Sequence, residues 1–153
     1  MVDEQVNEIP LEENKLVVTR FFQLLPEVTD RGNVQLLDEA LAVDVKIHGT
    51  AGEFSSLEDF KGAVREQSRA LNDNSIVMHH LISEGDLVSA TFTHAMTIVA
   101  QEFMGIPANG KRVAFSGTGK FHIVGNKIGE LWLHEDIPAL QTQLAAPDPG
   151  DKA

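Results

Sequence analysis

The chain has 153 residues, 42% of them hydrophobic, and a formal net charge of -11. This length and composition fit one globular domain with a substantial core. The acidity argues against nucleic acid or an anionic membrane surface as a partner, since both require patches of Lys and Arg, and the lack of cysteine excludes disulfides and thiol chemistry.

The two ends of the chain differ in composition from the middle. Residues 1–10 are polar, and residues 145–153 are rich in Pro, Gly and Asp. Both are predicted to be flexible tails around a single domain over 11–144. No apolar run is long enough to span a bilayer, and the start of the chain lacks the basic-then-apolar order of a signal peptide. A cytoplasmic protein is therefore expected.

Helical periodicity dominates the first half of the chain. Apolar residues at helical spacing predict helices over 13–28, 33–42 and 55–71. Asn33 is placed to cap the second of these helices. Ser56, three residues before Asp59, gives the third helix a start that resembles a capping box.

From residue 76 the pattern becomes alternating, which is typical of strands. Strands are predicted over 44–49, 75–83, 86–99, 111–124 and 127–136, and a last helix over 138–144. Helices followed by an antiparallel meander predict an α+β fold, in which a cone-shaped, curved antiparallel sheet carries the N-terminal helices over its concave face. Gly117 and Gly119 indicate a bend or bulge that gives the sheet its curl.

The last predicted strand carries an unusual group of polar residues. Strict alternation places Trp132, His134 and Asp136 on one face and Leu131 and Leu133 on the other. We expect the Trp-His-Asp face to look into the cone. The two leucines would then point outward and need a partner to cover them, which predicts a homodimer or higher homo-oligomer.

Several segments resemble those of one known family. The stretches are "LLDEALAVDVKIHG", "EFMGIPANGKRVAFSG" and "FHIVGNKIGELWLHEDIPALQTQL", and the likeness covers most of residues 14–144. They resemble the SnoaL-like polyketide cyclases, or ester cyclases, of the nuclear transport factor two-like superfamily. The resemblance implies a cone-shaped α+β fold, homo-oligomers, a hydrophobic pocket for a small molecule, and no metal or organic cofactor. It also implies aldol cyclisation of polyketide methyl esters by an aspartate acting as general acid and base.

Carried onto this chain, the resemblance matches the catalytic aspartate to Asp136 and a nearby histidine to His122. From the residues alone, Asp136 is either the base or the cap of the last helix. His122 is either part of a pocket wall or a hydrogen-bonded core or interface histidine. The predicted ligand-binding residues are Trp132, His134, His48, His94, Phe21 and Phe103.

Three functions remain open at this level. An acid/base enzyme suits a carboxylate in an apolar cavity. Three positions that are often polar in the family are apolar here, namely Ile98, Val99 and Leu131. Their apolar character favours a non-catalytic binding protein. An oligomerisation domain would leave the polar face without a purpose. An epoxide hydrolase ranks lower because Arg112 is predicted to lie in a loop, which leaves the pocket strands without arginine. No metal site is expected. Adjacent His79 and His80 point to opposite faces of a strand, and His134 with Asp136 lacks a third ligand at a clear spacing.

Overall fold

The computed structural model describes residues 2–50 and 52–147. The helical elements are α1 (Val2–Arg31), the 3-10 helix η1 (Val34–Glu39), α2 (Leu57–Ser68) and α3 (Ile137–Ala145). The strands are β1 (Leu41–Gly49), β2 (Gly52–Phe54), β3 (Leu71–Glu84), β4 (Leu87–Ile98), β5 (Glu102–Phe103), β6 (Ile106–Pro107), β7 (Lys111–Val124) and β8 (Lys127–Glu135). The backbone of the N-terminal segment predicted as a tail is thus helical from residue 2, and most of the predicted C-terminal tail lies outside the described residues.

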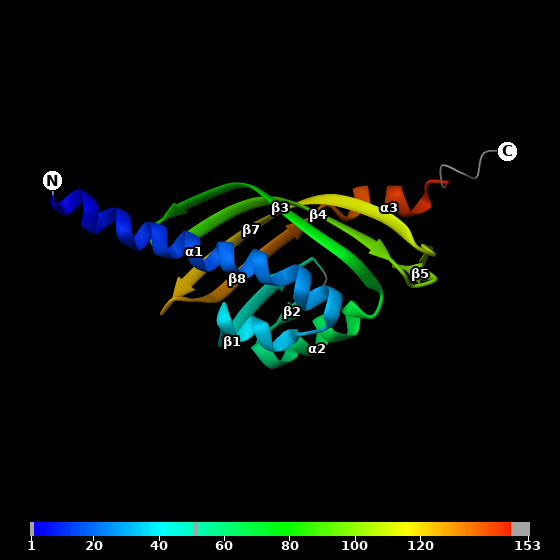
Figure 1. Cartoon of the computed structure of the whole chain (residues 1–153), viewed down its shortest axis with the longest axis horizontal. Helices are drawn as coiled ribbons and strands as arrows, with labels where there is room; N and C mark the ends of the chain where they lie inside the picture. The colour runs from blue at the N-terminus through cyan, green and yellow to red at the C-terminus, as the bar shows by residue number, and fades with distance from the viewer. Residues whose placement is uncertain (1, 51, 148–153) are drawn as a thin grey trace.

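Six strands form one curved sheet in the order β2-β1-β8-β7-β4-β3, and β5 and β6 form a separate ribbon. Figure 1 shows the long strands arching over α1, with α2 beside β1 and β2 and with α3 near the opposite end. This confirms the predicted α+β fold. One detail differs from the predicted antiparallel sheet. Strand β1 pairs in parallel with β8, so the sheet is mixed. No tight turn joins the two strands, since α2, β3, β4 and β7 lie between them in the chain, and a parallel pair needs such a long connection.

The first helix runs further than the sequence predicts. It passes Pro26 and ends at Arg31, with Gly32 following at a φ of 67°, a conformation that glycine adopts easily at a helix end. Val28 is fully buried beyond the proline, so packing against the sheet favours the extra turn. The second predicted helix is a short 3-10 helix, and Asn33 makes no side-chain cap there. Ser56 accepts a hydrogen bond from the Asp59 amide, as predicted for α2.

Gly117 and Gly119 let aromatic rings lie directly on β7. A Cβ atom at Gly117 would sit 2.4 Å from the Phe92 ring, and one at Gly119 would sit 2.8 Å from the Phe121 ring. No register shift occurs at either glycine, so neither forms the bulge that the sequence suggests. Their place is in the main core, where Phe92 and Phe121 pack against Phe21 and Phe22.

A second, smaller core lies where α3 packs on the other end of β7. It includes Met96, Phe115, Leu140 and Leu144. None of the helices described has the length and apolar character that crossing a membrane requires.

Candidate functional site

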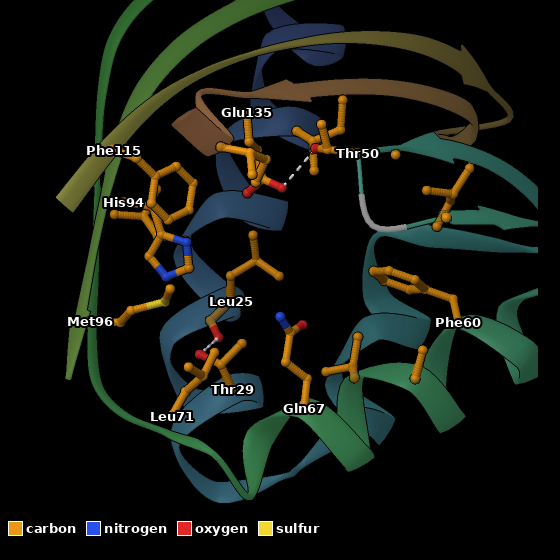
Figure 2. A pocket seen from close by; sticks show the side chains of 18 of the residues that line it. Leu25, Thr29, Thr50, Phe60, Gln67, Leu71, His94, Met96, Phe115 and Glu135 are labelled. Atoms are coloured by element: carbon orange, nitrogen blue, oxygen red, sulfur yellow. Dashed lines mark hydrogen bonds between the residues drawn. The ribbon is translucent and has the colours of Figure 1, made fainter. Parts of the chain in front are cut away.

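A cavity of about 440 Å³ lies between the helices and the concave face of the sheet. This volume falls within the usual range of small-molecule sites. Figure 2 shows Leu25 and Thr29 of α1, Phe60 and Gln67 of α2, and His94 and Phe115 of the sheet around it. Most lining side chains are apolar, and they include Phe21, Phe22, Ile47, Phe54, Val64, Ile76, Phe92, Met96, Phe103, Leu131, Leu133 and Leu140.

A bulge at Gly129 decides which side chains of β8 reach this cavity. Ile123 pairs with Ile128, whereas His122 pairs with Glu130, so Gly129 is an extra residue on β8. One inserted residue reverses the faces of everything that follows it. Leu131, Leu133 and Glu135 therefore line the cavity. The prediction that Trp132, His134 and Asp136 face into the cone is wrong. The reason for a dimer that rested on outward leucines disappears with it.

Glu135 is the carboxylate that the bulge brings into the cavity. Its Oε1 accepts a hydrogen bond of 3.0 Å from the Thr50 hydroxyl, drawn in Figure 2. Burial raises the pKa of Glu135 above its ordinary value of 4.5, although the Thr50 hydrogen bond works in the opposite direction. The sequence signal for this residue was Gly129, an isolated glycine inside a strand pattern.

His94 of β4 enters the same cavity, as Figure 2 shows. Its Nε2 lies 2.8 Å from Oδ1 of Asn74, a buried residue of β3. Burial lowers the pKa of His94 to about 4, while the charge of Asp30 raises it and that of Arg112 lowers it further. The imidazole is consequently neutral near pH 7, and it shares the cavity with a carboxylate whose pKa is also shifted toward the neutral form.

The family model for SnoaL-like polyketide cyclases matches residues 18–144. The chain belongs to the SnoaL-like polyketide cyclase family. None of the curated proteins compared with the chain matches it.

Solved structures share the fold of this SnoaL-like protein. TsrD from Streptomyces laurentii is 24% identical, with 86% of this chain and 97% of that chain covered and a TM-score of 0.72. IdmH from Streptomyces antibioticus is 22% identical, with 87% and 99% covered and a TM-score of 0.71. A SnoaL-like protein from Jannaschia sp. CCS1 is 17% identical, with 90% and 94% covered and a TM-score of 0.76. At these identities the likeness concerns the fold alone.

Some of the predicted site residues of this SnoaL-like protein line the cavity, and the others do not. Phe21, His94 and Phe103 line the cavity. The other five, Trp132, His134, His48, His122 and Asp136, are not among its lining residues. Within the part of the chain that is described, no three His, Asp or Glu side chains are grouped to hold a metal ion.

Asp136 caps α3, the structural alternative that the sequence left open. Its Oδ1 accepts a hydrogen bond of 3.1 Å from the Ala139 amide, and Pro138 lies in the first turn. This arrangement satisfies one of the free amides at the helix start.

Asp136→Ala should lower the free energy of unfolding by about 0.5 to 2 kcal/mol, because the cap is lost. Asp136→Asn should change it little, since asparagine caps about as well. Chemical denaturation of both variants measures the difference. Equal destabilisation by Ala and Asn would show that the charge of Asp136, rather than its capping oxygen, stabilises the fold.

His122 lies on the outer face of β7. Its Nε2 is 2.8 Å from Oδ2 of Asp86, and 36% of its side chain is exposed. The alternation on β7 is unbroken between Val113 and Ile123, and both of these residues are buried. His122 therefore lies on the opposite face from Phe121, which is buried in the main core. Arg112, predicted in a loop, belongs to β7 but binds Asp73 and Thr97.

His48 forms a cluster on the other side of the sheet. Its Nε2 lies 2.7 Å from Glu130 and its Nδ1 2.8 Å from Glu53, and the ring stacks on Trp132 at 5.5 Å. The Lys120 amine lies 4.5 Å from the Trp132 ring centre. The hydrogen bond to Glu130 and then the one to Glu53 raise the pKa of His48 above 6.5.

Because this pKa is raised in the folded state, the stabilisation from His48 is complete below pH 6.5 and disappears as the pH rises through the raised value. We expect the melting-temperature difference between the wild type and His48→Gln to shrink from pH 6.5 to pH 9. Thermal denaturation across this range measures it. A difference that does not vary with pH would mean that His48 stabilises the fold through its stacking on Trp132 alone.

Proposed function

We propose that this SnoaL-like protein is an acid/base enzyme that acts on a hydrophobic carbonyl compound, with Glu135 as the general base. The observation that carries the proposal is a carboxylate on the wall of a largely apolar cavity, with its pKa raised by burial. A base works best when its pKa approaches the working pH. Membership of the family supports a carbonyl substrate.

The reaction that fits is an intramolecular aldol cyclisation or an isomerisation. Glu135 removes a proton from the carbon next to a carbonyl, which leaves an enolate. In the cyclisation the enolate carbon forms a bond to a second carbonyl carbon of the same molecule, whose oxygen becomes an alkoxide. The protonated Glu135 then returns its proton to the alkoxide. In the isomerisation the proton goes back to a different carbon. Both sequences are balanced without any other reactant.

Two features of the cavity support this chemistry. Apolar walls keep water away from the carboxylate, which strengthens it as a base once it is ionised. Thr50 fixes the carboxylate through Oε1 and leaves Oε2 for the substrate.

A binding protein without chemistry is the second candidate, favoured by the apolar lining. Of the three apolar residues at often polar family positions, Leu131 lines the cavity, whereas Ile98 is buried in the second core and Val99 is 49% exposed. A cytoplasmic homodimer or higher homo-oligomer stays a prediction from the sequence.

A nitrobenzisoxazole separates the two candidates. A base removes its ring proton, the N–O bond breaks, and a coloured cyanophenolate forms without any cofactor. The flat aromatic probe fits the size of the cavity. We expect saturable release of the phenolate by the wild-type protein. Binding of the probe without release above the buffer rate would favour the binding protein.

A further inference from the structure

His94 is connected to the surface of the protein by a short chain of hydrogen bonds. Asp30, near the end of α1, accepts from Asn74 twice through Oδ1, once from the backbone amide at 2.9 Å and once from Nδ2 at 2.6 Å. Asn74 is 7% exposed and presents its Oδ1 to His94 Nε2 at 2.8 Å. The three residues come from α1, β3 and β4, so the fold holds them in place.

This chain fixes the tautomer of the imidazole. A carboxylate accepts hydrogen bonds, so the Asn74 group that faces Asp30 must be the NH₂. The Asn74 oxygen is then the atom facing His94, and Nε2 must carry the proton to donate to it. The neutral ring has one proton, which leaves a lone pair on Nδ1. Within the described residues Asn74 is the one hydrogen-bond partner of the ring, so Nδ1 is available to the cavity.

We propose that His94 is a specificity-determining acceptor whose Nδ1 receives a hydrogen bond from a hydroxyl group of the ligand, and that Asn74 and Asp30 are the positioning residues that hold it in this tautomer. The substrate class is then a mostly apolar carbonyl compound that also carries a hydroxyl. The inference rests on the proposed ligand site but not on Glu135 being a base. A neutral Nδ1 in a fixed tautomer accepts a hydrogen bond but does not donate one.

Other polar groups of the cavity must be separated from His94. The Thr29 hydroxyl donates to the Leu25 carbonyl at 2.8 Å, and the Thr50 hydroxyl donates to Glu135, so each oxygen keeps lone pairs that accept. Gln67 offers an amide that can turn to donate or accept, so it discriminates less. Glu135 is the charged acceptor of the cavity when it is ionised, and the experiment must separate it from His94.

The tautomer is measured first, on the ligand-free wild-type protein. Couplings between the ring protons and the ¹⁵N-labelled ring nitrogens distinguish protonation at Nε2 from protonation at Nδ1. We expect His94 to be protonated at Nε2 near pH 7. Asn74→Leu removes the acceptor and should give a mixture of tautomers, a change that a purely structural role would not produce. Protonation at Nδ1 in the wild type would overturn the inference.

Ligand selection is measured with naphthol and methoxynaphthalene, which differ in the hydroxyl donor. We expect the wild type to bind naphthol roughly tenfold more tightly, the value of one typical hydrogen bond. His94→Phe should remove this preference, whereas Glu135→Gln and Gln67→Leu should keep it. Loss of the preference in either of those two variants, with retention in His94→Phe, would overturn the inference. Failure of the proposed function appears elsewhere, as unchanged nitrobenzisoxazole turnover in Glu135→Gln.

Discussion

Replacing Glu135 with glutamine should reduce nitrobenzisoxazole turnover by about 10² to 10⁴, the usual contribution of a general base. Glutamine keeps the shape of the side chain and accepts the Thr50 hydrogen bond, but its amide does not take the proton. Binding of the probe should be nearly unchanged, so the loss should appear in kcat rather than in KM. Steady-state kinetics of the purified variant measure both.

Asp136→Asn is the matched control, because it makes the same chemical change at the next residue. Asp136 caps α3 and is not among the cavity residues, so this variant should keep its turnover. A large loss in Asp136→Asn with none in Glu135→Gln would return the base to Asp136.

The wild-type rate should also rise with pH through the pKa of Glu135, which burial places above 4.5, since only the ionised carboxylate accepts a proton.

Phe121→Ala should lower the free energy of unfolding by about 3 to 5 kcal/mol, the usual result of truncating a buried aromatic ring. Phe121 is fully buried, and its ring packs edge-on against Phe21 at 5.8 Å and Phe22 at 5.7 Å. Gly119 has no side chain to fill the place that the missing ring leaves. For a chain of this length the melting temperature should fall by about 6 to 20 °C.

His122→Ala is the control for the face of β7. His122 is the next residue, and its contact with Asp86 lies at the surface, so the variant should lose about 1 kcal/mol or less. Denaturation curves of the two variants therefore report which face of the strand meets the helices. A large loss in His122→Ala together with a small one in Phe121→Ala would reverse the assignment.

The sequence by itself determined the kinds and the order of the longer elements, but not the short strands β2, β5 and β6. The helical spacing over 55–71 and the alternation from residue 76 correspond to α2 and to the long strands β3, β4, β7 and β8, although β3 begins earlier, at Leu71. The Ser56 cap and the last helix also follow from local chemistry, because a cap or a turn depends on residues within one helical turn of each other. His94 was predicted among the ligand-binding residues, and it lines the cavity with Phe92 and Met96 of the same strand.

Only the tertiary structure decided which carboxylate enters the cavity. Asp136 and Glu135 are neighbours, and their faces depend on whether β8 contains a bulge. The bulge at Gly129 is the point where the pairing of β8 with β7 changes register. Ile128 pairs with Ile123 on one side of it, and Glu130 pairs with His122 on the other. The parallel pairing of β1 with β8 brings the end of β1, and with it Thr50, to Glu135. Both features are pairings between segments far apart in the chain. Such pairings depend on how the whole sheet packs on its helices. The period-two pattern of a single strand therefore does not predict them.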